Sequence, residues 1–509
     1  MMNLFFLCTQ FALSCALIAI AKHVLHKIRN LPPTPFPSLP ILGHFHLLRK
    51  PIHRCLSKIS DRYGPIVLLH FGYRKVLVIS SPELAEECFT KNDVVFANRP
   101  RFLAGKIMGS NYTNIVWAPY GDHWRNLRRI SALEILSAHR LQTLSAVRSD
   151  EVKFLIRRLL KASKMNQPAE MKSGFFEVMM NAMMRMISGK RFYGEEVEDS
   201  EEARRFREIS KETLEIALSN NVGEFLPMIR WFDGREKKLW AFKTKRDMFY
   251  QNLIDQNRKL QVDTSLILSD KTKQNRNLIQ VLLSMQETDP AYYTDQFIVG
   301  LMQTLLIAGT DTTAVTMQWA LSLLLNHPQV LEKAQAEIDN HVGSGRLIDE
   351  SDLGRLPYLR SVILETLRMY PPSPIIVPHE SSDDCTVGGY HIPRGTILFV
   401  NSWSIQNKPM IWADPRTFNP ERFLGVEGAR DGFRLMPFGS GRRACPGEGL
   451  AIRMIAFVLG SIIQCFDWER NHEKLVDMSE RLGFLLSKAQ PLQAKCKPRP
   501  FVSEILAQV

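Results

Sequence analysis

A cysteine near the C-terminal end of the chain lies in a loop whose composition suits a ligand site. The loop reads Phe438-Gly-Ser-Gly441-Arg-Arg443-Ala-Cys445-Pro-Gly447, and no second cysteine follows at metal-site spacing. One thiolate among glycines and arginines suits a large, flat, anionic cofactor such as haem. A thiolate ligand pushes electron density onto haem iron and favours O–O cleavage. The loop therefore indicates oxygen activation.

A second chemical segment interrupts a long apolar stretch. Residues 301–320 are mostly apolar, and four consecutive polar residues stand at their centre, which reads Ala308-Gly309-Thr-Asp311-Thr312-Thr. Polar side chains inside a buried helix are costly unless they have partners. An acid beside an alcohol can relay protons to a bound oxygen species, and a glycine lets a ligand approach the backbone. A capped helix end is the alternative, but the apolar pattern continues to Leu321.

Two further motifs combine charge with helical spacing. Glu365 and Arg368 are three residues apart in an apolar stretch, which predicts a buried ion pair with Arg422 as a third member. Trp124 and Arg128 are four apart and share a helix face. An indole N–H and a guanidinium can together hold a carboxylate. Taken alone, each motif also fits an ordinary surface helix.

Helices must position most of these groups. Hydrophobic periodicity predicts helices over 122–134, 149–161, 201–219, 235–260, 294–326, 328–339 and 358–370, and over the apolar stretch after Cys445 that runs to 466. Runs rich in β-branched residues predict strands at 66–71, 75–80, 385–387 and 396–401. The expected fold class is mainly α with small β-sheets.

Composition and charge narrow the class of protein. The 509 residues are 45% hydrophobic and 23% charged, which is a globular composition. Eight cysteines without CxxC pairs indicate reduced thiols facing the cytosol, not a disulfide framework or a zinc site. The net charge of +13 is spread along the chain without a nucleic-acid motif, so we expect no nucleic-acid partner. An anionic membrane surface and an acidic protein partner explain this charge equally well.

The N-terminal region predicts a membrane anchor. The uncharged run Leu4–Ala21 is long enough to span a bilayer, and the basic residues after it indicate a cytosolic C-terminal side. A cleaved signal peptide is the alternative, but no basic region precedes the run. Five prolines in 31–40 favour a stiff, extended spacer. We therefore expect an anchor with its basic flank over 1–30, a hinge over 31–44 and a catalytic domain over 45–509.

Taken together, the segments resemble a cytochrome P450 over essentially the whole chain. The motifs of that family occur in order: the proline hinge, Trp-Arg-x-x-Arg, Ala-Gly-x-Asp-Thr-Thr, Glu-x-x-Arg, Pro-Glu-Arg-Phe and the cysteine loop. The anchor and the stretches 96–100 and 118–130 look like a plant microsomal enzyme of the group containing isoflavone 2'-hydroxylases and sesamin-forming enzymes. The resemblance implies a cytochrome P450 fold behind a single transmembrane helix at the endoplasmic reticulum, with the catalytic domain cytosolic.

The resemblance also implies roles for individual residues. Cys445 would be the axial ligand of haem b iron, with Phe438 beside its sulfur. Asp311 and Thr312 match the catalytic acid–alcohol pair, while Glu365, Arg368 and Arg422 match a structural triad. The propionate-binding set would comprise Trp124, Arg128, His379 and Arg443, although a neutral histidine binds a carboxylate more weakly than arginine. The substrate pocket would include Phe102, Leu103, Ile107, Leu305, Ala308, Ile375, Ile376 and Leu485.

The implied reaction is monooxygenation of a medium-sized plant phenolic such as a flavonoid, lignan, benzophenone or xanthone. Electrons from NADPH would arrive through a separate cytochrome P450 reductase, with Arg125, Arg129 and Arg442 as candidates for its docking face. Hydroxylation and oxidative coupling are both open, as are terpenoid and indole substrates. Two other functions are a reductase-independent haem-thiolate isomerase or dehydratase and a non-catalytic haem or ligand-binding protein. The intact Asp311–Thr312 pair disfavours both.

Overall fold

A computed structural model describes residues 26–198, 200–218, 222–231, 234–264, 276–426 and 431–507, together with Gln10 and Val24. The α-helices are α2 (Ile52–Tyr63), α3 (Pro82–Phe89), α4 (Leu103–Ile107), α5 (Asp122–Glu134), α6 (Ala138–Thr143), α7 (Ser145–Lys164), α8 (Met171–Ser188), α9 (Glu201–Leu218), α10 (Arg235–Thr264), α12 (Leu278–Thr288), α13 (Asp295–Asn326), α14 (Pro328–His341), α15 (Pro357–Met369), α16 (Ser402–Asn407), α17 (Glu448–Cys465) and α18 (Val502–Ala507). Short 3-10 helices are η1 (Phe45–Leu47), η2 (Glu195–Val197), η3 (Val222–Glu224), η4 (Pro227–Trp231), η5 (Glu350–Arg355) and η6 (Pro420–Phe423).

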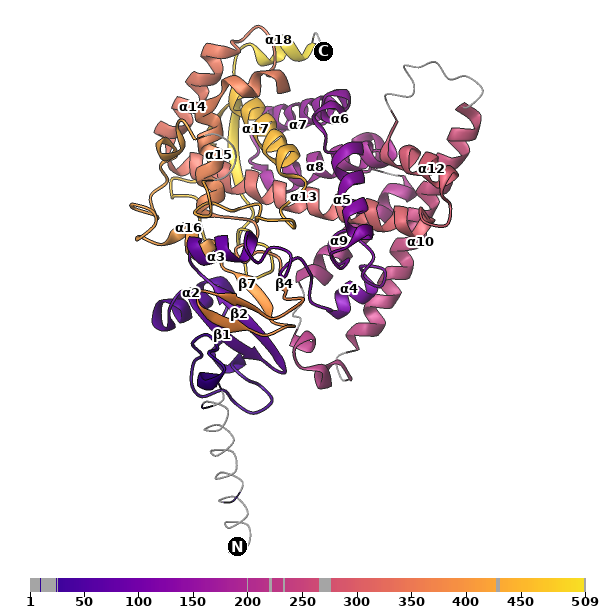
Figure 1. Ribbon diagram of the computed structural model, residues 1–509. Coiled ribbons are helices and arrows are strands. Elements are labelled where there is room, and N and C mark those ends of the chain that lie inside the picture. Colours follow the sequence, from indigo (N-terminus) through magenta and orange to yellow (C-terminus); the bar gives the residue numbers. More distant parts are fainter. Residues whose placement is uncertain are drawn as a thin grey trace, which may run out of the picture.

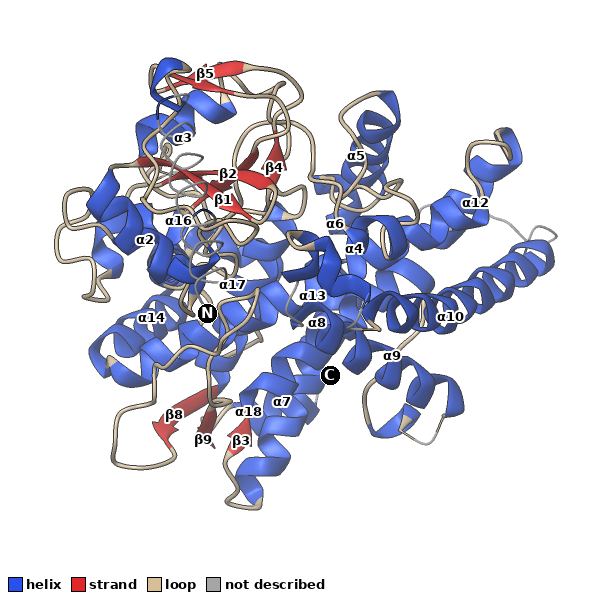
Figure 2. Ribbon diagram, turned by 90° about the horizontal axis from the view of Figure 1, so that it is seen from below, coloured by secondary structure: helices blue, strands red, loops and turns tan. Residues whose placement is uncertain are grey.

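The strands form three small sheets. Their bounds are β1 (Ile66–Phe71), β2 (Arg74–Ile79), β3 (Ala169–Glu170), β4 (His379–Glu380), β5 (Cys385–Val387), β6 (Tyr390–Ile392), β7 (Ile397–Val400), β8 (Phe466–Arg470) and β9 (Gln493–Pro498). The largest sheet has the order β1-β2-β7-β4, in which β2 and β7 run parallel and the other pairs antiparallel. A second sheet has the order β3-β9-β8, and β5 pairs with β6. In Figure 2 the β3-β9-β8 sheet lies beside α7, apart from the larger sheet.

The larger sheet is apolar on both faces. Side chains alternate between faces along a strand, and here Val67 and Val76 join one apolar cluster while Leu77 and Ile79 join another. The sheet therefore lies inside the molecule, with helices and loops on both sides. Figure 1 shows it at one end of the helical body, with the β1–β2 hairpin at the far side from α14 and α17.

Helix α13 is the central helix of the helical body. It crosses the molecule in Figure 1 and packs against α8, α15 and α17. Its first turn is capped by the Thr294 side chain, which accepts a hydrogen bond from the Phe297 N–H. Near its other end, Trp319 stacks on Tyr370 with ring centroids 4.0 Å apart, and the Trp319 indole N–H donates to the Leu486 carbonyl. Helix α13 is thus also hydrogen-bonded to the loop that contains Leu485.

The predicted fold class is confirmed, and each predicted helix and strand is present. The bounds differ by a few residues, most clearly in α7, which starts at Ser145 and not at 149. The sequence patterns missed α8, because 171–188 is apolar on nearly all sides and therefore shows no clear helical period. They also missed several shorter elements, among them helices α2, α3 and α12 and strands β8 and β9, of which the two strands complete the second sheet.

The predicted hinge packs on the protein instead of standing clear of it. The carbonyl of Pro33 accepts a hydrogen bond from the Leu68 N–H of β1, and the His44 ring bonds the carbonyl of Pro35. The predicted anchor falls mostly outside the described residues. Among those described, α13 and α17 are long and apolar enough to span a membrane, but 72% of each apolar window is buried in the protein. Their hydrophobicity is that of core helices.

Candidate active site

The cysteine loop is a tight turn that leads directly into α17. The Cys445 N–H donates to the Phe438 carbonyl at 2.9 Å, and the Ala444 N–H donates to the Gly441 carbonyl at 3.0 Å. These bonds close the turn, and the exposed Cys445 lies three residues before α17 begins. A thiolate near a helix N-terminus is favoured by the helix dipole. The turn therefore presents a thiol suited to bind a metal as its anion.

Gly441 is required by the shape of this turn. Its φ is +68°, and a Cβ there would lie 2.4 Å from the Asp93 carboxylate. The same carboxylate accepts a hydrogen bond from the Arg442 N–H at 3.0 Å and forms an ion pair with the Arg442 guanidinium. The loop is thus anchored to the segment after α3, and one predicted docking residue, Arg442, is already paired.

Three arginines gather beside the thiol without an acidic partner. Arg443 donates to the carbonyls of Ala97, Ile115 and Ala118, and Arg128 donates to that of Ala444 at 2.7 Å. Burial, together with repulsion from Arg99 and Arg128, lowers the pKa of Arg443 to about 9. Within the described ranges, no carboxylate hydrogen-bonds Arg99, Arg128 or Arg443. This arginine cluster therefore lacks a counter-anion of its own.

The sequence patterns overlooked Arg99. Its guanidinium donates to the carbonyls of Val377 and Pro378 and its Nε is buried without a partner, while burial lowers its pKa to about 9. Its isolation could not be seen in the sequence, because the surrounding groups are distant along the chain.

Two other predicted cofactor residues contribute less directly. The Trp124 indole N–H donates to the Ile115 carbonyl, so it is already occupied, and the ring lies 4.4 Å from the Arg443 guanidinium. The His379 Nδ1 bonds the Phe96 carbonyl, which makes Nδ1 the donor and leaves Nε2 as an acceptor in the neutral ring. Burial, with the charge of Arg99, holds the pKa of His379 well below its usual value. Trp124 supports Arg443, and His379 can donate to a carboxylate only after taking up a proton.

These groups fit haem. A dianionic cofactor with two carboxylates supplies the counter-charge that the arginine cluster lacks, and burying such unpaired cations is otherwise costly. The thiol beside the cluster supplies a soft ligand suited to iron. The donor set therefore matches the cofactor expected from the sequence.

The polar centre of α13 is divided between two faces of the helix. The Thr312 hydroxyl donates to the Ala308 carbonyl at 2.7 Å, and Ala308 is exposed in an otherwise buried stretch. Burial raises the pKa of the Asp311 carboxyl to about 6, and the charge of Lys172 at the start of α8 offsets part of the rise. Gly309 faces α8, where a Cβ would lie 3.1 Å from Met183, so close helix packing accounts for this glycine.

The predicted triad is present and buried. Glu365 and Arg368 are both fully buried and share two hydrogen bonds of 2.6 and 2.8 Å, while the Arg422 Nε lies 3.1 Å from the Glu365 carboxylate. Arg368 also donates to the carbonyls of Gln406 and Pro415. The triad thus fastens α15 to α16 and to the loop before η6.

Replacing Glu365 with glutamine should strongly destabilise the protein, since it leaves the Arg368 charge buried without a counter-charge. Loss of one member of a buried pair costs about 3–5 kcal/mol. Thermal unfolding of the haem-containing protein would show this as a large fall in Tm and in yield. The matched variant Glu421→Gln removes the charge of a partly exposed partner of Lys333, keeps an acceptor for the Tyr358 hydroxyl, and should cost less than about 1 kcal/mol. Equal Tm values for the two variants would contradict a structural role for Glu365.

The predicted pocket residues fall into several apolar clusters. Phe102 and Ile375 share one cluster, Leu103 and Ile107 share another with Leu239 of α10, and Leu305 belongs to the main core. Ile376 packs on the other face of the sheet. The predicted pocket residues therefore do not form one continuous packed group.

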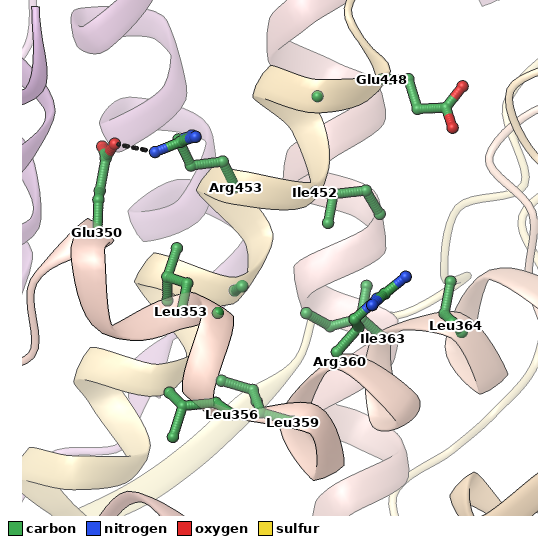
Figure 3. Close-up of a pocket in the computed structure, with 13 residues that line it drawn as sticks. Glu350, Leu353, Leu356, Leu359, Arg360, Ile363, Leu364, Glu448, Ile452 and Arg453 are labelled. Atoms are coloured by element: carbon green, nitrogen blue, oxygen red, sulfur yellow. Dashed lines mark hydrogen bonds and ion pairs between the residues drawn. The ribbon is translucent and has the colours of Figure 1, made fainter. Parts of the chain in front are cut away.

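A cavity of about 370 Å³ lies elsewhere, between η5, α15 and the first turns of α17 (Figure 3). Leu353, Leu359 and Ile452 contribute to its apolar wall, and Glu350 and Arg453 form an ion pair at its edge. None of the predicted pocket residues lines it. This cavity is therefore separate from the predicted substrate pocket.

Known proteins match this sequence and fold closely. The cytochrome P450 family model matches residues 32–496. Cytochrome P450 81Q32 of Catharanthus roseus is 50% identical, with 95% of each chain covered, and isoflavone 2'-hydroxylase of Glycyrrhiza echinata is 47% identical with the same coverage. (+)-Piperitol/(+)-sesamin synthase of Sesamum radiatum is 47% identical over 94% of this chain and 93% of its own.

Among solved structures, a zebra fish cytochrome P450 with abiraterone superposes with a TM-score of 0.75 at 26% identity, covering 89% of this chain and 100% of that one. The region matched by the family model, residues 32–496, contains the thiolate loop, the arginine cluster, the polar centre of α13 and the buried triad. The chain belongs to the cytochrome P450 family and is a haem-thiolate monooxygenase.

Proposed function

We propose that the protein oxidises a medium-sized plant phenolic, such as an isoflavone or a lignan, by hydroxylation or oxidative coupling. As a P450 monooxygenase it uses O2, a small-molecule substrate and a redox partner. The observation that carries the substrate class is the high identity to an isoflavone 2'-hydroxylase and a sesamin synthase over nearly the full chain. The mostly apolar pocket residues suit an aromatic substrate.

The proposal assigns a separate role to each side chain of the site. Cys445 ligates the haem iron, and thiolate-bound haem supplies the reductive activation of O2. Arg99, Arg128 and Arg443 bind the propionates, and Trp124 holds Arg443 in place. His379 takes up a proton when a propionate approaches, because a nearby anion favours the charged imidazole. Asp311, whose pKa lies near neutrality, and the Thr312 hydroxyl would take up and release the protons that oxygen activation requires.

Replacing Arg99 with glutamine should have opposite effects on the two forms of the protein. The haem-free protein should be more stable because a buried, unpaired cation is gone, whereas the haem-containing protein should lose haem about tenfold faster because one charge-assisted bond is gone. Haem transfer to apomyoglobin and Tm of the haem-free protein measure the two effects. The control Arg101→Gln changes an exposed neighbour and should alter neither. Unchanged haem loss in Arg99→Gln would contradict its role.

The proposed electron donor is NADPH–cytochrome P450 reductase, a partner that would meet the face around the thiolate loop. Two of the candidate docking residues are locally neutralised, because Arg125 pairs with Asp122 and Arg442 with Asp93. The Arg129 guanidinium donates to the neutral side chain of Asn126, which does not offset its charge. Arg129 is therefore the best of the three candidates for pairing with an acidic partner.

The proposed location is the endoplasmic reticulum membrane, with a single N-terminal anchor and the catalytic domain in the cytosol. Exposed apolar side chains support a second membrane contact near the hinge, since large exposed apolar patches mark such sites. They are Ile28, Phe36, Leu39, Ile41, Leu42, Tyr73, Met228, Ile229 and Trp240. Beside the exposed Met228 and Ile229, Phe225 packs inward, so only part of that segment suits membrane contact.

Expression with a plant reductase in microsomes tests the function. A panel of isoflavones, lignans, terpenoids and indoles would be screened for haem spin-state shifts and for substrate-stimulated NADPH consumption, followed by product identification. Phenolics should give the shift and an oxygenated or coupled product. Turnover without NADPH and reductase would favour an isomerase or dehydratase, and a shift only with terpenoids or indoles would overturn the phenolic class.

A further inference from the structure

The segment that follows α9 is tied to α4 by one buried carboxylate. Glu224, the last residue of η3, is 4% exposed. Its carboxylate accepts hydrogen bonds from the Leu103 N–H at 2.8 Å and from the Ala104 N–H at 3.4 Å. Helix α4 has no side-chain cap of its own, because Phe102 occupies the capping position. The first turn of α4 therefore takes its cap from a residue 121 positions away.

Aromatic packing fixes the same junction. The ring of Phe225 lies 5.7 Å from those of Phe71 and Phe102 and 5.8 Å from that of Phe45. A Cβ at Gly72 would lie 2.0 Å from the Phe225 carbonyl oxygen, so the β1–β2 turn accepts no side chain there. The carboxylate of Glu224 and the ring of its neighbour thus bind two different elements, α4 and the β1–β2 hairpin.

Helix α4 belongs to segment 97–118, which reaches from the thiolate loop to α13. The segment that contains it is bonded to Arg443 of the thiolate loop on both sides, through the carbonyls of Ala97 and Ala118. On the α13 side, the Asn114 side chain lies against Gly300. Leu103 itself packs with Leu239 of α10. Movement of α4 would therefore widen the space between the thiolate loop and α13.

We propose that Glu224 is a specificity-determining positioning residue that holds α4 against segment 222–231 and thereby limits the size of ligand that can reach the haem iron. It acts through the two backbone N–H groups and not by touching the substrate. This inference goes beyond the proposed function, because it depends on the haem pocket and not on the substrate class. Glutamine at this position keeps the shape but loses the charge that strengthens both hydrogen bonds.

Two iron-binding azoles of different size test this on the full-length haem-containing protein in microsomes. Stopped-flow spectroscopy would follow binding and release of imidazole, which is small, and of clotrimazole, which is bulky. Glu224→Gln should speed binding and release of clotrimazole about tenfold, as expected for loss of one charged hydrogen bond, and should leave imidazole unchanged. Glu236→Gln, in the first turn of α10, is the matched control and should change neither.

A second pair of variants removes the bond from the other partner. Leu103 is the first residue of α4, where proline is well tolerated and lacks the N–H that donates to Glu224. Leu103→Pro should accelerate clotrimazole exchange beyond Leu103→Ala, which loses only the side chain. Unchanged clotrimazole rates in Glu224→Gln, or equal acceleration of both azoles, would overturn the proposal. If Glu224→Gln gives no haem-containing protein, the comparison of Leu103→Pro with Leu103→Ala tests the proposal alone. Equal clotrimazole exchange rates in these two variants would then overturn the proposal.

Discussion

Replacing Cys445 with serine should abolish the thiolate-type spectrum of the reduced, carbon-monoxide-bound protein and reduce monooxygenation to background. The hydroxyl of serine is a poor ligand for haem iron and cannot supply the electron density that a thiolate gives. The hydrogen bond from the residue-445 N–H to the Phe438 carbonyl does not involve the side chain, so the loop should keep its shape. This is the largest effect that we expect from any single substitution.

The matched control is Cys385→Ser, a partly buried cysteine on β5. Burial raises the pKa of the Cys385 thiol to about 11, so it is protonated at neutral pH and is a poor metal ligand. This variant should keep the thiolate-type spectrum. Total haem measured by the pyridine haemochrome separates loss of the ligand from loss of the cofactor. If Cys445→Ser retained the thiolate-type spectrum, another residue would have to be the iron ligand.

Local sequence patterns predicted most of the long helices. Helices α5, α13 and α15 have clear amphipathic or apolar stretches between polar ends, and their observed bounds lie within one residue of those expected. The failure at α8 has the opposite cause, since most of its side chains are buried and no polar face marks the helical period. Strands β8 and β9 are short and meet across more than twenty residues, so their pairing is not visible in either segment alone.

The functional site could be predicted where the residues that act together belong to one short motif, as in the cysteine loop and the Glu365–Arg368 pair. It was not predictable where partners come from distant segments. Arg99 contacts carbonyls 278 residues away, so nothing near it in the sequence marks it as an unpaired cation. The indole N–H of Trp124 is occupied by the Ile115 carbonyl nine residues earlier, and the sequence pattern does not show that this nearby carbonyl takes the donor.

Asp311 illustrates how position on a helix decides chemistry. It adjoins Thr312 in sequence, but the threonine hydroxyl is bonded back to the Ala308 carbonyl, and Asp311 is influenced by Lys172 of α8. Successive residues on a helix point about 100° apart. The Asp311 carboxyl and the Thr312 hydroxyl therefore lie at different positions around the helix. A pKa of about 6 is close enough to neutrality for Asp311 both to take up and to release a proton.

Replacing Asp311 with asparagine should lower product formation about 100-fold, the size typical of a lost proton-transfer group. The same variant should be more stable at neutral pH. The folded-state pKa is raised from 3.8 to about 6, so the wild-type protein loses stability as pH rises through that interval, whereas asparagine does not titrate. The free energy of unfolding of Asp311→Asn should exceed that of the wild type by about 2–3 kcal/mol above pH 6, and the difference should disappear below pH 4.

Product formed per NADPH consumed and Tm measured between pH 4 and 8 give the two readouts for Asp311. Asp311→Glu, which keeps the acid, should restore much of the product yield and also the pH dependence of Tm. A residue needed only for packing would behave differently, because its loss would lower activity and stability together. A fall in both for Asp311→Asn would therefore contradict the proton-transfer role. Lower activity together with higher stability in Asp311→Asn is the result expected when a buried acid serves proton transfer at the expense of stability.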